Sequence, residues 1–337
     1  MRSFFLLLAV AVVAVAVDPP GTVYEEEVKA SVPVRDRAWH LLGKYIDSLP
    51  EKGEPSGKTL AKKIGYPAPH IQARHLRLEK IASDSIATYY RAYTELGDIL
   101  EGYGLYIVPH GPPGGPYPLV IAQHGGGGSP ELALFHGGSN YHDMIRGAVR
   151  QGYVVYAPLI TMYPYVDRDN GTEIPAEVRR DFDNALRKRG TSLFAVETTM
   201  ISEALTLLLK RPEVDRKRVA MIGLSYGGFY TLYQMALDKR IKTGVASCSF
   251  RDYDEAEWAS KPKEGRPFDV PPAELVKLIS PRPIQIQCGL KDTNLPIESA
   301  RKAAEKVKGT AGLDYKEFDG PHEWNGELAW KFLKAEL

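Results

Sequence analysis

The 337-residue sequence lacks several features that would define a specialised class of protein. Its two cysteines, Cys248 and Cys288, are too few for a disulfide scaffold, and neither belongs to a CxxC pair that could hold zinc. We expect two buried free thiols on neighbouring strands, with a disulfide as the alternative in an exported protein. Charge of one sign is not in excess either, because 43 Lys and Arg residues oppose 42 Asp and Glu residues. The net charge of +1 argues against nucleic acid as a partner.

Long hydrophobic runs are also missing, with one exception near the N-terminus. Residues 4–17 are all apolar, but this run is shorter than the ~20 residues that a membrane-spanning helix needs. Arg2 precedes the run, and Ala14 and Ala16 form the small-x-small pattern that signal peptidases accept. We therefore predict a signal peptide over residues 1–16 and a secreted or periplasmic protein without a stable membrane anchor. A retained N-terminal anchor is the alternative.

The rest of the composition is typical of a folded globular protein. Hydrophobic residues make up 44% and charged residues 25% of the chain, which excludes disorder and a fibrous repeat. Residues 17–75 combine an amphipathic stretch (37–46) with polar, turn-rich segments. This mixture predicts a partly helical N-terminal extension that packs on a later core, and residues 76–337 are predicted to form the main domain.

The pattern of the main domain predicts an α/β fold. Residues 76–108 are rich in strand-forming residues and end in a Gly/Pro turn cluster. Beyond the cluster, strands alternate with helices, which indicates a mostly parallel central sheet with helices on both faces. The expected strands of this part are 118–122, 153–157, 218–222, 245–247, 284–287 and 315–318.

Two long segments, 160–190 and 251–272, interrupt this alternation. Connections of this length between core elements are usually functional lids or binding loops. Both segments follow strands, and ligands of open α/β sheets bind outside the carboxyl ends of the strands. We therefore predict two lid insertions beside the functional site.

A G-x-S-x-G pattern centred on Ser225 is the first chemical signal. The five letters alone are weak, but they directly follow the apolar run 218–222 and directly precede the helical stretch 228–237. A strand-to-helix turn is the context of a nucleophile elbow, in which flanking glycines permit a sharp turn and expose the serine. The pattern predicts Ser225 as a catalytic nucleophile.

A serine nucleophile needs a base and a carboxylate that orients the base. His322 is the only histidine after Ser225, and it lies in a loop directly after the last expected strand. Asp292 follows the strand-like run before it and is the predicted acid. Asp252 and Asp254, which follow the preceding strand, are the alternatives.

Four consecutive glycines, residues 125–128, follow His124 and the expected strand 118–122. This is where the second half of an oxyanion hole is expected, because glycines let backbone N–H groups turn inward without obstruction. We predict that the amide of Tyr226 and the amide of Gly125 or Gly126 stabilise the oxyanion. A phosphate-binding loop is the alternative, but the Lys-[Ser/Thr] of a P-loop is missing.

Other polar and aromatic residues carry weaker signals. Trp258 and Trp324 are predicted to line the substrate pocket, with packing in the lid or the core as the alternative. His136, His142 and Asp143 lack the helical pairing of metal ligands, so structural or surface roles are predicted for them. We predict no metal and no organic cofactor.

Several segments together resemble a known superfamily. They are the run 212–219, Tyr226 and the glycine pair 227–228 after the serine, and the segments around Asp292 and His322. Over residues 103–337 the chain resembles the α/β-hydrolase superfamily. The resemblance is to its prolyl oligopeptidase-like, dienelactone hydrolase-like and acetyl xylan esterase-like branch.

The resemblance also has a finer level. The pair of His322 and Glu323 is similar to the His-Glu pair of the cephalosporin C deacetylase and acetyl xylan esterase group. The Arg-Gly-Gln motif of that group is replaced here by residues 124–126. The resemblance implies an α/β-hydrolase catalytic domain over residues 76–337 and acyl transfer to water through an acyl-serine.

The sequence therefore predicts an exported serine carboxylesterase that acts on small-molecule or carbohydrate esters, acetyl esters of carbohydrates among them. A serine peptidase resembling the prolyl oligopeptidase group is one alternative. Those enzymes carry a β-propeller, for which residues 18–117 are too few. A catalytically inactive hydrolase fold that serves as a binding module is the other alternative.

Overall fold

The computed structural model describes residues 21–111, 115–135, 139–160, 176–252 and 270–337. The predicted signal peptide (1–16), Asp254, Trp258 and His136 lie outside the described residues. Within the described part, no helix combines the length and the apolar character needed to cross a membrane.

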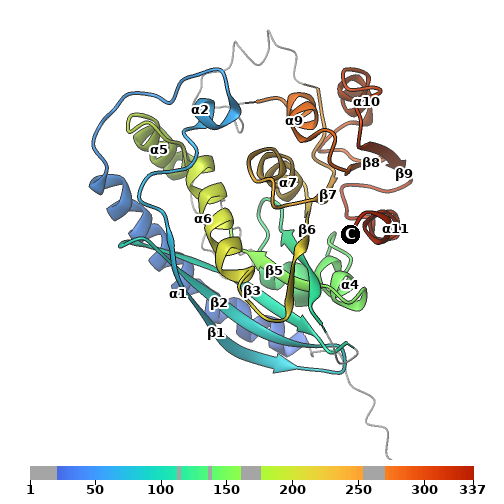
Figure 1. Cartoon of the computed structure of the whole chain (residues 1–337), viewed down its shortest axis with the longest axis horizontal. Coiled ribbons are helices and arrows are strands. Elements are labelled where there is room, and N and C mark those ends of the chain that lie inside the picture. Colours follow the sequence, from blue (N-terminus) through green and yellow to red (C-terminus); the bar gives the residue numbers. More distant parts are fainter. Residues whose placement is uncertain (1–20, 112–114, 136–138, 161–175, 253–269) are drawn as a thin grey trace, which may run out of the picture.

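The described residues form one mixed sheet of nine strands in the order β1-β2-β3-β5-β4-β6-β7-β8-β9 (Figure 1). The strands β1, β2 and β3 form an antiparallel meander, and β3 pairs antiparallel with β5. From β5 to β9 all neighbours are parallel. The strands are β1 (Ala73–Ser83), β2 (Ala87–Leu96), β3 (Leu100–Pro109), β4 (Tyr117–Gln123), β5 (Val154–Pro158), β6 (Val214–Leu224), β7 (Thr243–Ser247), β8 (Ile284–Gly289) and β9 (Leu313–Phe318).

Helices cover both faces of the sheet, as the alternating pattern predicted (Figure 1). Side chains of neighbouring residues in β4 and β6 alternate between the two faces. Leu119 and Met221 join one core cluster together with α6 and α7, whereas Val120 and Ile222 join the other together with α4 and α11. Because both faces are buried, these strands are apolar throughout rather than alternating. The main helices are α1 (Gly21–Ser48), α2 (Leu60–Ile64), α3 (Pro130–Phe135), α4 (Met144–Arg150), α5 (Ala176–Arg187), α6 (Leu193–Leu208), α7 (Tyr226–Leu237), α9 (Pro272–Ile279), α10 (Ile297–Glu305) and α11 (Gly326–Glu336).

The N-terminal extension is helical and packs on the sheet. The helix α1 contacts β3, α3 and α5, and the side chains of Leu42 and Tyr45 share a core cluster with Leu96 of β2. An ion pair of 2.7 Å between Glu27 and Arg91 also ties α1 to β2. The predicted amphipathic stretch 37–46 is thus the last part of a longer helix, and the division of the chain at residue 75 stays a prediction.

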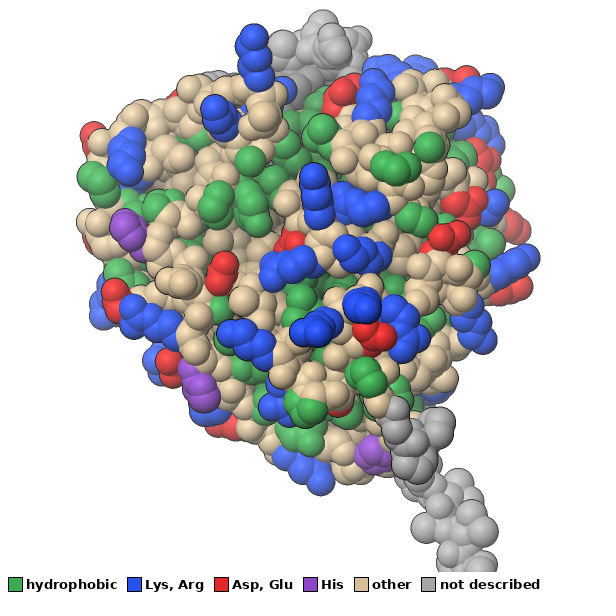
Figure 2. Space-filling view, viewed as in Figure 1, with side chains coloured by type: hydrophobic (Ala, Val, Ile, Leu, Met, Phe, Trp, Pro, Cys, Tyr) green, Lys and Arg blue, Asp and Glu red, His purple; other side chains and the backbone are tan. Residues whose placement is uncertain are grey.

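The amino edge of the parallel strands carries exposed basic side chains. They follow α6 and α7, at the start of β6 and β7, and include Lys210, Arg216, Lys217 and Lys239. Figure 2 shows Lys and Arg side chains gathered over α6, β6 and the connection from α7 to β7. The residues of the predicted site follow the opposite, carboxyl ends of the strands.

Candidate active site

Ser225 lies in a strained turn between β6 and α7. Its backbone has φ 58° and ψ −119°, a positive-φ conformation outside the left-handed helical region that non-glycine residues rarely adopt. The flanking glycines are needed for this turn. A Cβ at Gly223 would overlap the backbone of Gly227, and a Cβ at Gly227 would overlap the carbonyl oxygen of Gln123. The G-x-S-x-G pattern therefore reflects backbone crowding around a serine at the carboxyl edge of the sheet.

His322 and Asp292 come together in the loops after β9 and β8. Nδ1 of His322 lies 2.7 Å from Oδ2 of Asp292, and the two side chains are 15% and 1% exposed. Oδ1 of Asp292 accepts hydrogen bonds from the amides of Asn294 (2.8 Å) and Leu295 (2.9 Å). A bond through Nδ1 leaves Nε2 as the nitrogen that could accept a proton from a serine.

The environment of Asp292 favours its charged form. Burial alone would raise the pKa of this carboxyl group, but the hydrogen bonds from His322 and from the two amides lower it below its ordinary value. The alternative acid, Asp252, instead lies 2.6 Å from Nζ of Lys306. Within the described residues, the structure thus brings His322 to Asp292 and not to Asp252.

Hydrogen bonds through β7 connect the serine turn with the histidine loop. The amide of Ser225 donates to the carbonyl of Ser247 (2.8 Å), and the hydroxyl of Ser247 donates to the carbonyl of Glu323 (3.1 Å). Asn140 donates to the carbonyl of His322 at 3.1 Å. Among the described residues, the Ser225 hydroxyl makes no hydrogen bond to His322. Such bonds often form only once substrate is bound.

The glycine loop after β4 lies against the serine. A Cβ built on Gly125 would be 3.2 Å from Cβ of Ser225, so the loop backbone and the nucleophile are close neighbours. The amide of Gly125, however, donates to the hydroxyl of Tyr141 at 2.7 Å. Gly125 and Gly126 are the alternative donors predicted for this half of the oxyanion hole. Because the amide of Gly125 already has a hydrogen-bond acceptor, the structure favours the amide of Gly126. The amide of Tyr226 is the first of α7.

Two residues that sequence reasoning missed hold this loop in shape. Tyr141 is buried, and burial raises the pKa of its hydroxyl well above its ordinary range, so the phenol stays neutral. The sequence marks His124 only by its position before the glycines. Its Nδ1 lies 2.8 Å from the carbonyl oxygen of Gly125, and its Nε2 accepts from the amide of Ile160 (3.0 Å). No local sequence pattern marks Tyr141, because its partner lies sixteen residues earlier.

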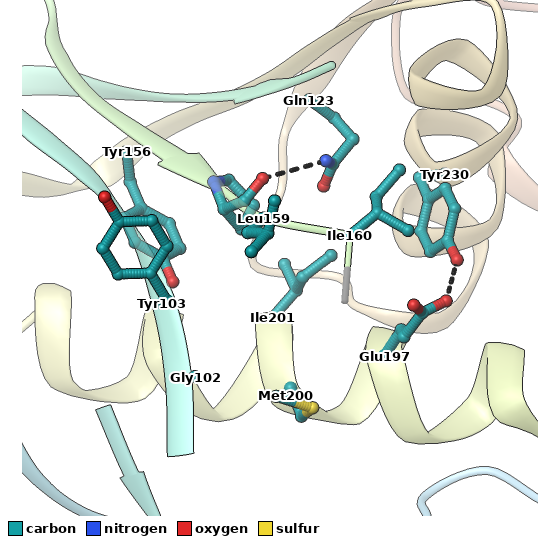
Figure 3. Close-up of a pocket in the computed structure, with 11 residues that line it drawn as sticks. Gly102, Tyr103, Gln123, Tyr156, Leu159, Ile160, Glu197, Met200, Ile201 and Tyr230 are labelled. Carbon is teal, nitrogen blue, oxygen red and sulfur yellow. Dashed lines mark hydrogen bonds between the residues drawn. The ribbon is translucent and has the colours of Figure 1, made fainter. Parts of the chain in front are cut away.

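A small cavity of about 20 Å³ lies between the end of β5, the helix α6 and Gln123 (Figure 3). Gln123, which directly precedes the loop, lines it and donates from its side chain to the carbonyl of Pro158 at 3.0 Å. Tyr230 donates to Glu197 on the same side of the cavity. This volume is enough for about one water molecule and is far below the roughly 300–1,000 Å³ of small-molecule sites, and the lining combines apolar and polar groups. The full lining is Gly102, Tyr103, Gln123, Tyr156, Pro158, Leu159, Ile160, Glu197, Met200, Ile201 and Tyr230.

Arg179 connects this cavity to the residue after the nucleophile. Its guanidinium lies 5.8 Å from the centre of the Tyr226 ring. Burial would lower the pKa of Arg179, but the nearby Glu197 carboxylate raises it, so the guanidinium stays charged. A cation on the face of an aromatic ring is a favourable contact. The contact links α5 to the side chain of the residue that follows Ser225.

The two predicted substrate-lining tryptophans have different outcomes. Trp258 lies outside the described residues. The side chain of Trp324 is only 2% exposed and packs against Trp330, with 5.7 Å between the ring centroids. The structure therefore places Trp324 in the hydrophobic core, where it has almost no surface to offer a substrate.

His142 and Asp143, for which the sequence predicts structural or surface roles, each lie beside a charged residue. Nε2 of His142 lies 2.6 Å from Glu323, and Asp143 lies 3.6 Å from Arg150. In the described ranges, one group of three side chains has ligand atoms close enough to share an ion, namely Cys248, Asp292 and His322.

Both cysteines are buried free thiols on neighbouring strand segments, as expected. Burial and the charge of Asp292 raise the pKa of the Cys248 thiol to about 12. Burial likewise raises the pKa of Cys288. Because the thiolate is the reactive form, neither cysteine has the properties of a catalytic nucleophile.

Comparison with known proteins supports the fold. No protein-family model matches the chain. A relative from Bacillus subtilis (strain 168), named "Putative hydrolase YtaP", is 24% identical over 205 residues. The match spans 57% of this chain and 66% of that relative, just under two thirds of its length.

Solved structures match over most of the chain. A glucuronoyl esterase from Solibacter usitatus has a TM-score of 0.57 at 17% identity, covering 88% of this chain and 91% of that one. Acetyl xylan esterase 1 from Thermoanaerobacterium sp. JW/SL YS485 has a TM-score of 0.54 at 19% identity, covering 94% and 98%. The fold is the α/β-hydrolase fold, and the predicted fold class is confirmed.

Proposed function

We propose that the protein is an exported serine esterase that hydrolyses acyl esters through Ser225, His322 and Asp292. The observation that carries this proposal is the geometry at the carboxyl edge of the sheet. A strained serine turn, a glycine loop in contact with it and a histidine held 2.7 Å from a buried carboxylate meet there. A binding module would have no need of this combination of groups.

Each group has a role in the proposed reaction. The hydroxyl of Ser225 attacks the ester carbonyl while Nε2 of His322 takes its proton, and His322 then gives this proton to the departing alcohol. Asp292 keeps the proton of the imidazole on Nδ1 and stabilises the imidazolium. Water repeats the cycle on the acyl-serine, with His322 again as the base, and releases the acid.

Backbone amides stabilise the negative charge that forms on the carbonyl oxygen. We assign this role to the amides of Tyr226 and Gly126, because the amide of Gly125 already donates to Tyr141. Each such donor contributes about 3 kcal/mol to the stability of the transition state. Tyr141 and His124 position the loop and do not themselves contact the substrate.

The substrate class that we propose is an acyl ester of a small molecule or a carbohydrate. The names of the matching structures, a glucuronoyl esterase and an acetyl xylan esterase, favour carbohydrate esters. The residues before β4 form α1, α2 and three strands of the sheet rather than propeller blades, which favours an esterase over a peptidase gated by a propeller.

The test compares substrates and a single variant. The purified protein is assayed with p-nitrophenyl acetate, acetylated xylan and a dipeptidyl anilide, with Ser225→Ala as the matched control. Ester turnover that disappears in Ser225→Ala is the expected result. Turnover of the anilide alone would replace the esterase by a peptidase. A wild-type protein that hydrolyses none of them and is not labelled by a fluorophosphonate would leave the binding module as the better explanation.

Export is tested separately, since it depends on residues 1–16 alone. N-terminal sequencing of the protein recovered outside the cytoplasm is expected to begin at Val17. Recovery only in the cytoplasm, with Met1 in place, would contradict export and leave the esterase proposal intact.

A further inference from the structure

Cys248 is a third polar side chain beside the acid and the base, and the proposed reaction does not use it. It follows β7 directly and has a positive φ of 47°. One ligand atom from each of Cys248, Asp292 and His322 lies within 4.8 Å of the other two. The sulfur also lies 3.4 Å from the carbonyl oxygen of Glu323. The thiol is thus held in a fixed position against the histidine loop.

The three donor types match those that bind zinc. Zinc takes sulfur, imidazole nitrogen and carboxylate oxygen at about 2.0–2.3 Å, so that two ligands on one tetrahedral ion are about 3.3–3.8 Å apart. The widest separation in the cluster, at most 4.8 Å, must therefore shorten by only about 1 Å, while the His322–Asp292 pair, now 2.7 Å apart, opens by about 0.6 Å. Rotation of side chains is enough for changes of this size. Three protein ligands leave a fourth position for water.

The charges also match. A thiolate from Cys248 and the carboxylate of Asp292 together balance the two charges of the ion. Burial of a net charge would be costly, and this cluster with zinc would carry none. The side chain of His322 is 15% exposed, which gives the ion a path from solvent to the two buried ligands.

We propose that Cys248, Asp292 and His322 bind Zn²⁺ and that this binding reversibly inhibits the enzyme. The inhibitory part rests on the proposed function, whereas the binding part does not. When the ion binds, the thiol of Cys248 releases its proton to solvent and forms the S–Zn bond. Nδ1 of His322 exchanges its bond to Asp292 for a bond to zinc, and the remaining imidazole proton is carried on Nε2. No electron is transferred.

Inhibition follows from this change of the imidazole. A protonated Nε2 donates a hydrogen bond and cannot accept the proton of Ser225, so the serine is not activated. Asp292, bound to zinc, no longer orients the ring. Removal of the ion by a chelator restores the original pair.

The experiment measures binding and inhibition separately. The full-length protein is treated with EDTA, dialysed, and titrated with Zn²⁺ in equilibrium dialysis and with Co²⁺ in absorption spectroscopy, where a sulfur ligand gives a charge-transfer band. The turnover of p-nitrophenyl acetate is followed over the same Zn²⁺ range. Cys248→Ala is the test variant, and Cys288→Ala is the matched control, because Cys288 is a buried free thiol on the next strand and outside the cluster.

The wild type and Cys288→Ala are expected to bind one Zn²⁺ per chain and to lose activity together as the site fills. Loss of an outer-shell partner alone weakens metal binding about 10–100-fold, so removal of the sulfur ligand is expected to weaken it at least tenfold. Inhibition of each variant is expressed relative to its own rate without metal. EDTA is expected to restore the wild-type rate.

Equal Zn²⁺ affinity in Cys248→Ala and the wild type would overturn the site, as would a Co²⁺ complex without a sulfur band. Cys248→Ser keeps the side-chain volume, and it is used with the same criteria if Cys248→Ala does not fold. Stoichiometric, sulfur-dependent binding by a protein that hydrolyses no ester would support the site and contradict the esterase. Binding without inhibition of an active esterase would overturn the inhibitory part.

Discussion

The two edges of the parallel sheet use polar residues in different ways. At the amino edge, charged side chains are exposed and pair with near neighbours, as Arg218 does with Asp215 at 2.7 Å. Exposed pairs of this kind contribute about 0–1 kcal/mol each. At the carboxyl edge, Asp292 and His124 are buried, and each makes two or more hydrogen bonds with the loops around Ser225. Loss of one partner there leaves a buried group unsatisfied, which costs more.

Backbone strain also differs between the two edges of the sheet and is concentrated at the carboxyl edge. Five non-glycine residues of the described part have a positive φ, and four of them lie around the site. These four are His142, Asp143, Ser225 and Cys248, whereas the fifth, His70, lies before β1. Strained conformations persist only where the surrounding structure enforces them, and they cluster at functional sites. The carboxyl edge therefore holds most of the backbone strain of the described residues, and substitutions at the two edges are expected to differ.

The largest difference is expected between Ser225→Ala and Lys217→Ala. Removal of a serine nucleophile lowers kcat by about 10⁶-fold where it has been measured in a triad enzyme. Lys217 is exposed at the amino edge, and such substitutions change stability by less than about 0.5 kcal/mol. Both variants are assayed for ester turnover, with circular dichroism as the check on folding. Full activity of a folded Ser225→Ala would remove the serine from the mechanism.

The next largest effect is expected for Asp292→Asn. An amide cannot hold the imidazole in the required tautomer, and the equivalent change in a triad enzyme lowers kcat about 10⁴-fold. Asp252→Asn is the matched control, because Asp252 also lies at the carboxyl edge but pairs with Lys306. A partly exposed pair of this kind is worth about 1 kcal/mol or less, so Asp252→Asn is expected to reduce kcat less than about fivefold. The reverse order would move the catalytic acid to Asp252.

A smaller effect is expected for Tyr141→Phe, which keeps the ring and removes the hydroxyl. The amide of Gly125 then loses its 2.7 Å partner, and an unsatisfied buried donor costs about 1–3 kcal/mol. We expect kcat to fall roughly tenfold with little change in KM, because the loop acts on the transition state. Kinetics with p-nitrophenyl acetate measure both constants. An unchanged kcat would mean that the loop keeps its shape without Tyr141, or that the released amide replaces Gly126 as the donor.

These positions also differ in how well the sequence predicts them. The turn at Ser225 is encoded by five adjacent residues, and the order of strands and loops points to His322 and Asp292. Tyr141 and Cys248 lie close to segments far away in the sequence, and no local sequence pattern indicates such contacts. For Trp324 the structure favours the alternative of packing in the core, for a related reason. It lies two residues from His322, but the chain turns at Asn325, the cap of α11, and directs the indole into the core.

The predicted helical extension shows the same limit. The apolar spacing of residues 37–46 indicates a helix there, and α1 continues from Gly21 to Ser48 through Pro33. Packing against β3 and α3 stabilises the longer helix, and such tertiary contacts cannot be read from local propensity. Elements with strong local patterns were thus predictable, whereas their lengths and partners depend on the fold.

The smallest expected effect is a dependence of stability on pH at the carboxyl edge. The pKa of Asp292 is lower in the folded protein than its ordinary value, mainly through His322 and the two amides that offset its burial. A carboxyl group with a lowered pKa stabilises the fold above its unfolded pKa of about 3.9, and this contribution disappears as the pH falls through the folded value.

The free energy of unfolding is measured by urea titration between pH 7 and pH 3 for the wild type and Asp292→Asn. The difference in the free energy of unfolding between the wild type and Asp292→Asn is expected to narrow below about pH 4. Asp215→Asn provides the amino-edge comparison, because Asp215 also has a lowered pKa, but its side chain is 23% exposed against 1% for Asp292 and is more strongly screened by solvent, so a weaker dependence is expected. An equal or stronger dependence for Asp215→Asn would mean that burial does not distinguish the two edges.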